Sequence, residues 1–335
     1  MPLGGRSTPR RTPLVARRYA ADMRAIVFES AGGAEVMRLE ERPDPVPGSD
    51  ELLVEAMYSG INPADLNQRA GHYPAPPGSP ADVPGLEVCG RVVDRGENVT
   101  EWGLGDRVFG IVGGGGLADR VRVNGRHVAR VPDRLDEQQA AAVPEAFITA
   151  HDAIFAQAGL RSGERLLVNG ANGGVGLAVV QLGLAAGVQV LANARSQPAR
   201  ERLAALGAEP VSLDQAHAVN VVLELVGAPN ILGDLEALAT GGRIVLVSTA
   251  GGSKMEMPLR ALMAKRATIV GTLLRARPIE QKGSAVQAFA REVVPHLESG
   301  AIDPIVDRVF PASDAAAAFD HMERPGKFGK VLLGW

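Results

Sequence analysis

The sequence is poor in cysteine, carries little excess charge and has no long hydrophobic run. Its one cysteine, Cys89, cannot form a disulfide within the chain, which fits a reducing cytosol. A net charge of −3 over 335 residues argues against nucleic acid or an anionic membrane surface as a partner. A membrane-spanning helix needs about 18 consecutive apolar residues, and no run approaches that length. These absences predict a cytoplasmic protein with neither a nucleic-acid nor a membrane partner.

Residues that commonly bind metal ions are equally sparse. Catalytic zinc takes about three Cys, His or carboxylate ligands in a close arrangement. The six histidines are scattered along the chain without the spacing of a ligand set, and the single cysteine cannot supply a cluster. The sequence therefore predicts no metal site.

Residues 1–22 differ in composition from the rest of the chain. They hold five arginines, several Ser, Thr, Pro and Gly residues and a single acidic residue, Asp22. We expect a disordered N-terminal extension, with an organelle transit peptide as the alternative. A strand pattern, RAIVFE, follows Met23, where we expect the fold to begin.

Residues 165–181, RLLVNGANGGVGLAVVQ, carry the most informative motif. An apolar run ends at Asn169, and small residues then occupy the one, three and six positions of a dinucleotide fingerprint before a helical pattern. Such a turn lets the backbone approach a pyrophosphate, which lies against the free N–H groups and positive dipole end of the helix. The predicted contacts are Gly170, Ala171, Asn172, Gly173, Gly174, Val175 and Gly176.

The chain divides into a β-rich part and an alternating part. From residue 23 to about 130, short strand patterns recur with Gly and Pro between them. Farther on, strands and helices alternate, which predicts an α/β fold with a parallel sheet covered on both faces. Helices are expected at 144–159 and 279–299, and strands at 305–310 and 329–333 are expected to return to the first part. The six sheet strands are expected at 165–169, 188–193, 209–213, 220–226, 243–248 and 267–273.

One connection in the alternating part is too short for a crossover helix. Only residues 214–219 separate the third and fourth predicted strands. Extended chain of that length can reach about 20 Å, so a bare loop can make the link.

Several segments stand in a familiar order around the fingerprint. They are GINPADLNQRAGHYPAPPG (60–78), PGLEVCGRV (84–92), GDRVFGIVGGGG (105–116), PEAFITA (144–150), GTLLRARP (271–278) and GKFGKVLL (326–333). With them, residues 23–335 resemble the medium-chain dehydrogenase/reductase superfamily, in its zinc-free quinone oxidoreductase branch.

The resemblance implies two domains with an active-site cleft between them. A Rossmann doubly wound parallel sheet, residues 144–278, would be inserted in a chaperonin-like (GroES-like) β-rich domain made of residues 23–143 and 279–335. It also implies a homodimer in which the strand at 267–273 pairs across a two-fold axis. That strand is an open sheet edge, which suits such pairing.

The resemblance further implies chemistry without zinc. Zinc-containing relatives supply a Cys, a His–Glu pair and a second Cys, and the matching positions here are Asn62, Leu86–Glu87 and the region of Pro144–Glu145. Without a Lewis acid an alkoxide is hard to stabilise. Hydride delivery to an electron-poor acceptor needs no such help, which suggests a quinone or a conjugated carbonyl as the substrate.

Cofactor preference depends on the end of the second Rossmann strand. NAD enzymes usually place an acidic residue there to hold the ribose hydroxyls. This chain has Ala194, followed by Arg195 and Ser196, so no carboxylate repels a 2′-phosphate and a guanidinium can pair with it. We therefore expect NADPH, bound by Arg195 and Ser196. The alternative is a solvated arginine and a serine that only caps a helix.

Tyr73 and Asn62 are the candidate catalytic residues. Tyr73 matches the family's cleft tyrosine, and a phenol can donate a hydrogen bond to a carbonyl that is being reduced. The alternative is a loop tyrosine packed on neighbouring prolines. Asn62 matches a position that points at the nicotinamide ribose or the substrate in relatives, so it is also a candidate cofactor contact. Its alternative is an asparagine that caps the turn before Pro63.

Further cofactor contacts are implied by the resemblance alone. Thr149 matches the residue that contacts the nicotinamide, and its alternative is a helix-interior threonine bonded to its own backbone. Two loops would cover the nicotinamide half and a C-terminal segment would lie near the cofactor. The matching residues are Ser248, Thr249, Leu274 and Arg275 in the loops, and Gly329 and Lys330 in the segment.

Together these residues predict an NADPH-dependent oxidoreductase that transfers a hydride to quinones or quinone-like carbonyls. An enoyl or alkenal double-bond reductase is the first alternative, because it uses the same hydride delivery. The second alternative is an NADPH-binding, redox-responsive module with little turnover.

Overall fold

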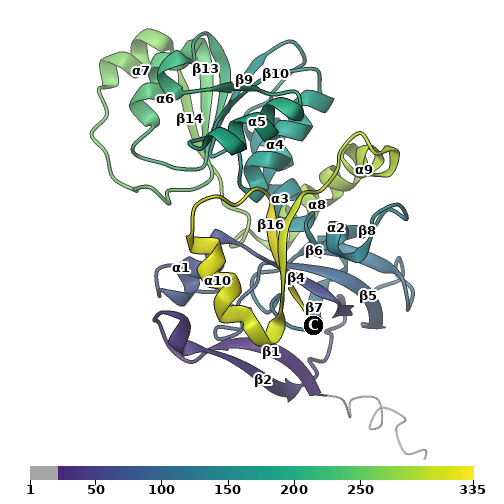
Figure 1. Ribbon diagram of the computed structural model, residues 1–335. Coiled ribbons are helices and arrows are strands. Elements are labelled where there is room, and N and C mark those ends of the chain that lie inside the picture. Colours follow the sequence, from purple (N-terminus) through teal and green to yellow (C-terminus); the bar gives the residue numbers. More distant parts are fainter. Residues whose placement is uncertain (1–21) are drawn as a thin grey trace, which may run out of the picture.

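The computed structural model describes residues 22–335 (Figure 1). The extension predicted for residues 1–22 therefore lies outside the described residues, apart from Asp22. Asp22 is the first residue of strand β1 (Asp22–Phe28), one position before the expected start at Met23. It belongs to the fold because it pairs with Pro43, the last residue of β2 (Met37–Pro43).

Six parallel strands form the sheet predicted for the alternating part. Their order is β11–β10–β9–β12–β13–β14, the doubly wound order in which ligands bind at the carboxyl ends of the two central strands. The predicted sheet is confirmed, although β13 begins at Leu238 rather than at Arg243. The strands are β9 (Arg165–Asn169), β10 (Gln189–Asn193), β11 (Glu209–Val211), β12 (Val219–Glu224), β13 (Leu238–Leu246) and β14 (Thr268–Gly271).

The sheet separates two apolar cores because alternate side chains of a strand point to opposite faces. On β9, Leu166 and Val168 belong to one core, whereas Leu167 belongs to the other. Burial on both faces explains why the strands read as nearly continuous apolar runs. Helices α3 (Pro144–His151), α4 (Gly174–Ala185) and α5 (Gln197–Ala205) pack on the first core, and α6 (Ile231–Ala237) and α7 (Leu259–Lys265) on the second (Figure 1).

The short link between the third and fourth strands has no crossover helix, as predicted. Between β11 and β12 the chain forms only the 3-10 turn η5 (Leu213–Gln215). The apolar side chain of Leu213 packs on the second core, so the link covers the sheet where a helix would otherwise lie.

The β-rich part joins both ends of the chain. Its main sheet is antiparallel, in the order β7–β3–β5–β6–β8, and β1 pairs with β2. The C-terminal strand β16 (Lys330–Gly334) lies between β15 (Val306–Pro311) and β4 (Tyr58–Ile61), which confirms the predicted return of the chain. The main strands are β3 (Glu51–Ala56), β5 (Glu87–Arg95), β6 (Arg107–Ile111), β7 (Arg120–Asn124) and β8 (Val128–Arg130).

The apolar segment ELLVEAMYSG (51–60) contains two strands, β3 and the start of β4. Met57 separates β3 from β4 and is 54% exposed. Ala56 pairs with Gly90 in the main sheet, whereas Tyr58 pairs with Gly334 at the end of the chain. The break directs β4 toward the C-terminal strand, so the residues that follow β4 come close to the start of β16.

Two of the predicted helices are interrupted. The pattern predicted for 144–159 forms α3 and then the π-helix η4 (Asp152–Gln157). The pattern at 279–299 divides at Val293 into α8 (Ile279–Glu292) and α9 (Val294–Ser299), because Pro295 has no N–H to continue the hydrogen-bond ladder. The remaining α-helices of residues 22–335 are α1 (Pro63–Arg69), α2 (Glu137–Ala141) and α10 (Ala315–Glu323).

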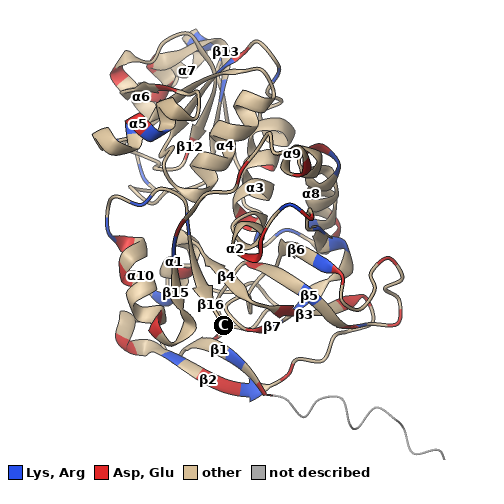
Figure 2. Ribbon diagram, turned by 45° about the vertical axis from the view of Figure 1, so that its right-hand side comes forward, with Lys and Arg blue, Asp and Glu red and all other residues tan. Residues whose placement is uncertain are grey.

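Acidic and basic side chains are interspersed over both parts of the molecule (Figure 2). Within residues 22–335, no helix combines the length and apolar character that crossing a membrane requires.

Candidate active site

The turn after β9 leaves a helix N-terminus open. Gly170 has a φ of 76°, a left-handed conformation that favours glycine. A Cβ at Gly176 would stand 2.4 Å from the Gly170 carbonyl oxygen, so α4 can approach the turn only without a side chain there. Gly173 is the N-cap of α4, and no side chain caps this helix. A helix N-terminus without a side-chain cap presents backbone N–H groups and a positive dipole end, which is the arrangement that binds phosphate.

The segment before β16 packs against this turn. The Gly329 N–H donates to the Asn172 carbonyl at 3.3 Å, and the Asn172 side-chain amide donates to the Lys327 carbonyl at 2.9 Å. A Cβ on Gly174 would stand 2.8 Å from the Cδ of Lys330. The structure thus brings Gly329 and Lys330, which only the resemblance suggested, next to the glycine turn.

A buried ion pair lies beside the turn. The Nζ of Lys330 and the Oε1 of Glu87 are 2.5 Å apart, and the two side chains are 5% and 2% exposed. Asn62 completes the cluster, because its Oδ1 accepts from Lys330 at 2.7 Å and its Nδ2 donates to Glu87 at 2.8 Å. The second oxygen of Glu87 accepts the Glu145 backbone N–H at 2.9 Å. These hydrogen bonds offset the cost of burying both charges.

Asn62 is the N-cap of α1 and forms a capping box with Asp65, so its alternative role is also present. The Asp65 Oδ2 accepts the Asn62 N–H at 2.8 Å and its Oδ1 accepts the Gly85 N–H at 2.9 Å. Burial raises the pKa of Asp65 to about 6. Asn62 thus begins α1 and at the same time bonds Lys330 and Glu87 with its amide group.

Glu145 and Thr149 lie one helical turn apart on α3. The Thr149 hydroxyl donates to the Glu145 carboxyl at 3.5 Å, a long contact. Burial, together with the nearby Glu87 carboxylate, raises the pKa of Glu145 to about 8. Burial also raises the pKa of Tyr73, with a further contribution from Glu145. Glu145 therefore carries a proton at neutral pH close to the predicted catalytic tyrosine.

Arg275 is held on three sides by the β-rich part. Its Nε donates to the Gly113 carbonyl at 2.8 Å and one Nη donates to the Tyr73 carbonyl at 3.1 Å. The other Nη donates to the Gln68 amide oxygen. The guanidinium also lies 5.0 Å from the centre of the Tyr73 ring. Arg275 thus fixes the Tyr73 loop, and the neighbouring Leu274 is buried in the first core.

A carboxylate on the π-helix anchors the loop that carries Leu274 and Arg275. Asp152 accepts two bonds from Arg277, at 2.8 and 2.7 Å, and one from the Thr272 hydroxyl at 3.0 Å. Asp152 is 4% exposed, so this bidentate pair is well shielded from water. The loop is consequently tied to both parts of the molecule.

Arg195 and Ser196, the residues predicted to make the protein prefer NADPH, lie at the surface after the end of β10. Ser196 is the N-cap of α5, and its Oγ accepts the Ala199 N–H at 3.4 Å. Arg195 is exposed and forms no hydrogen bond or ion pair with a described residue. Burial lowers the pKa of Lys327, the Asp307 carboxylate acts in the opposite direction, and the charge of Arg195 lowers it further. Lys327 and Arg195 therefore lie close enough to interact, and no acidic residue stands at the end of β10, where the chain has Ala194.

Ser248 and Thr249 follow β13 at the same edge of the sheet. The Ser248 Oγ accepts the Ala250 N–H at 3.3 Å. A Cβ on Gly227 would stand 2.9 Å from the Thr249 Cα, so the loops after β12 and β13 are in close contact. The carboxyl ends of the parallel strands thus bring these two residues to the sheet edge that carries the glycine turn.

Two fully buried carboxyl groups lie beneath that edge. Glu224 ends β12 and Asp234 lies on α6, and the Asn169 amide donates to both, at 2.6 and 2.7 Å. Glu224 also accepts the backbone N–H groups of Val226 and Gly227, which shapes the loop after β12. Burial and the adjacent Glu224 raise the pKa of Asp234 to about 8. The pair therefore retains a proton at neutral pH.

The positions that match a zinc ligand set do not form one. Asn62 and Glu87 are both bonded to the Lys330 ammonium, whose charge opposes a second cation there. Within residues 22–335, no three His, Cys, Asp or Glu side chains gather in a way that could hold a metal ion.

Comparisons with known proteins match this architecture. One family model, described as an alcohol dehydrogenase GroES-like domain, matches residues 48–133, and another, described as a zinc-binding dehydrogenase, matches residues 189–333. The quinone oxidoreductase of Mus musculus is 33% identical over 329 residues, which cover 93% of this chain and 97% of the mouse protein.

Solved structures agree over the same length. An alcohol dehydrogenase superfamily protein from Novosphingobium aromaticivorans has a TM-score of 0.83 at 29% identity, over 93% of this chain and 99% of its own. A mycobacterial protein solved as a complex with NADPH has a TM-score of 0.83 at 27% identity, over 93% and 100%.

The chain belongs to the medium-chain dehydrogenase/reductase superfamily, in its quinone oxidoreductase branch. This medium-chain reductase is therefore an oxidoreductase made of a GroES-like part and a Rossmann-type sheet. The sheet is of the kind that binds a nicotinamide dinucleotide.

Sequence reasoning passed over several residues of this reductase's site. Glu87 had a signal, because a carboxylate inside an apolar strand pattern needs a buried partner. Glu145 and Lys327 had none beyond proximity to recognised motifs. Asp152 appears in a helical pattern as an ordinary charged residue, and only its burial, at 4% exposure, sets it apart.

From the Glu87–Lys330 pair we predict that removing the lysine alone destabilises the protein and that removing both charges restores most of the stability. Lys330→Met should lower the free energy of unfolding by about 3–5 kcal/mol, because it leaves Glu87 charged and unpaired in the interior. Urea denaturation measures the loss. In the double variant Lys330→Met/Glu87→Gln most of the loss should return. A double variant as unstable as the single one would show that Lys330 acts through packing alone.

Asp234 predicts a fall in stability with rising pH. Its carboxyl has a pKa of about 8 in the folded protein but about 4 in the unfolded chain, so the folded state binds more protons between these values. Each pH unit in that window should cost up to about 1.4 kcal/mol. Asp234→Asn should flatten this slope in urea titrations from pH 5 to 8. Equal slopes in both proteins would contradict a proton held at this site.

Proposed function

We propose that this chain is an NADPH-dependent oxidoreductase that delivers a hydride to quinones or quinone-like carbonyls without zinc. The observation that carries the proposal is the Asn62–Glu87–Lys330 cluster. Asn62 and Glu87 match positions at which zinc relatives have ligands, and here both are bonded to the Lys330 ammonium. A site without a Lewis acid requires an acceptor that is already electron-poor, and quinones meet that condition. The name of the mouse relative, quinone oxidoreductase, supports this class of acceptor.

Residues suited to NADPH surround the glycine turn. The open N-terminus of α4 would take the pyrophosphate, and Arg195 with Ser196 and Lys327 would take the 2′-phosphate. The mycobacterial neighbour solved as a complex with NADPH supports this choice. When bound, NADPH supplies the hydride. The nicotinamide half would be bordered by Asn62, Thr149, Ser248, Thr249, Leu274, Arg275, Gly329 and Lys330.

The chain's own residues would orient the acceptor and manage a proton. The Tyr73 hydroxyl donates a hydrogen bond to the acceptor carbonyl, and Arg275 holds the tyrosine in place through the backbone and the ring. Glu145, which is protonated at neutral pH, is the nearby group from which the reduced oxygen can take a proton. Most of the catalysis then comes from positioning rather than from a strong acid.

We further propose a homodimer formed through β14. This strand is hydrogen-bonded to β13 on one side and is the outermost strand of the sheet. An open edge of this kind invites pairing with a second copy. Light scattering at micromolar concentration should give the mass of a dimer, and a monomer would contradict the proposal.

One set of assays tests the proposed activity. NADPH oxidation is followed with 1,4-benzoquinone, with 9,10-phenanthrenequinone and with a panel of enones, each with and without a zinc chelator. We expect turnover of the quinones that the chelator does not change. Turnover of enones alone would identify a double-bond reductase, and tight NADPH binding without turnover would identify a binding module. Loss of activity with the chelator, or stoichiometric zinc in elemental analysis, would overturn the zinc-free mechanism.

Arg195 predicts the cofactor preference. Arg195→Ala should weaken NADPH binding about tenfold or more, because it removes a charge-assisted bond to the 2′-phosphate. NADH binding should stay nearly unchanged, since NADH has no such phosphate. Fluorescence titration of both cofactors measures this, with the exposed Arg260→Ala as a matched control. Equal losses for both cofactors, or a wild type that prefers NADH, would contradict the assignment.

Tyr73 predicts a moderate effect on turnover. In Tyr73→Phe the ring under Arg275 and the carbonyl that binds it both remain, so the variant removes only the hydroxyl. Turnover of quinones should fall by tens-fold or less, the equivalent of about 1–2 kcal/mol in the transition state. Complete loss would make Tyr73 an obligatory acid. An unchanged rate would leave the tyrosine only a packing role.

A further inference from the structure

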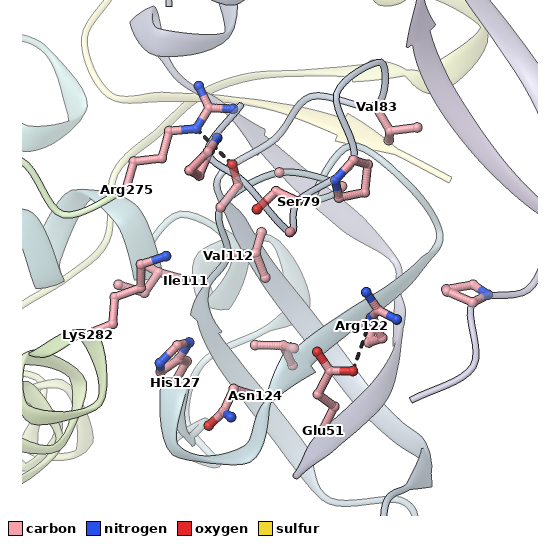
Figure 3. Close-up of a pocket in the computed structure, with 18 of the residues that line it drawn as sticks. Glu51, Ser79, Val83, Ile111, Val112, Arg122, Asn124, His127, Arg275 and Lys282 are labelled. Atoms are coloured by element: carbon pink, nitrogen blue, oxygen red, sulfur yellow. Dashed lines mark hydrogen bonds and ion pairs between the residues drawn. The ribbon is translucent and has the colours of Figure 1, made fainter. Parts of the chain in front are cut away.

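A large pocket lies beside the site, on the side of the β-rich part. It has a volume of about 680 Å³ and is bounded by residues 76–83, 111–115 and 275–282, with β7 along its outer wall. Figure 3 shows Ile111 and Val112 on its floor between Arg275, His127 and Lys282. The wall therefore combines an apolar surface with cationic side chains. Arg275 also contacts the Tyr73 carbonyl, so the pocket and the predicted catalytic loop share a wall.

Lys282 differs from the other cations of this pocket. Its side chain extends from α8 into the pocket (Figure 3), and the residue is only 7% exposed. Its ammonium forms no hydrogen bond or ion pair within residues 22–335. Each arginine of the pocket wall has a partner within the protein. Arg275 donates to its three acceptors. The other arginines pair with carboxylates: Arg42 with Asp82, Arg120 with Glu55, Arg122 with Glu51 and Arg277 with Asp152.

The groups around Lys282 give its ammonium no paired counter-charge. Burial lowers the pKa of Lys282, the charge of Arg275 lowers it further, and Glu145 acts in the opposite direction. His127 cannot accept from the ammonium with its Nε2, which contacts the Ile279 carbonyl at 2.9 Å. The Lys282 Nζ is not one of the fully enclosed unpartnered polar atoms of the described residues, so the ammonium faces the open pocket. An anion that enters the pocket would meet a cation without a protein partner.

We propose that this pocket holds the anionic end of the hydride acceptor, with Lys282 as its counter-charge. The ligand is a planar, amphipathic acid: an aromatic or conjugated body on Ile111 and Val112, and a carboxylate or sulfonate on the ammonium. The inference rests on the proposed function, because the ligand is taken to be the acceptor. It adds a substrate class, acidic quinones or enones, and makes Lys282 a specificity-determining residue.

The test compares two probes of the same shape that cannot be reduced. Isothermal titration measures 2-naphthoate and neutral 2-naphthamide binding to the full-length protein saturated with NADPH. Wild type should bind 2-naphthoate at least about tenfold more tightly than the amide, and Lys282→Met should abolish that preference while leaving the amide unchanged. The control, Lys254→Met, removes an exposed lysine and should keep the preference. Lys282→Gln serves as a second neutral variant if the methionine variant does not fold.

A kinetic arm separates this inference from the proposed activity. With 1,2-naphthoquinone-4-sulfonate, Lys282→Met should raise KM about tenfold, and with neutral 1,2-naphthoquinone it should leave KM unchanged. If no quinone is turned over but the naphthoate preference depends on Lys282, the proposed function fails and the anion pocket stands. Equal binding of both probes to wild type, or a preference that survives in Lys282→Met, overturns the inference whatever the activity.

Discussion

The buried pair of Glu87 and Lys330 is the interaction on which the geometry of the site depends. Glu87 begins β5 and Lys330 begins β16, so the pair joins the first part of the chain to its last strand. The same carboxylate binds the Asn62 amide and the N–H that opens α3 at Glu145. Two buried charges persist only when their remaining bonds are satisfied, and this requirement fixes several elements at once.

Positive charge near the site falls into two classes. Lys330 and Arg275 are fully bonded by groups of the protein, so they order the structure. Arg195 and Lys282 have no bonded partner among the described residues, and Lys327 donates only to the Arg324 carbonyl. Cations without internal partners are the ones suited to anions that arrive from outside. This difference underlies both the proposed 2′-phosphate site and the proposed acidic acceptor.

Local motifs carried much of the prediction because their chemistry is local. The glycine turn after β9 depends on backbone conformation and on a nearby helix N-terminus, both set by adjacent residues. The Asn62 amide could not be assigned in this way. Asn62 is the N-cap of α1, and its bond to Lys330 exists only because the fold brings in a strand 268 residues away in sequence. The break at Met57 likewise follows from pairing with the C-terminal strand.

By itself the sequence determined the α/β class, the parallel sheet, the dinucleotide turn and the absence of an acid after β10. Periodicity, glycine positions and residue type are properties of short segments, so they can be recognised without coordinates. Only the tertiary structure decided which charged residues are neutralised within the protein and which face a pocket. Buried ion pairs join Glu87 to Lys330 and Asp152 to Arg277, and a buried hydrogen bond joins Asn169 to Asp234, all far apart in sequence. For that reason Lys282 has the sequence signature of a surface lysine but lies nearly buried in the wall of a pocket.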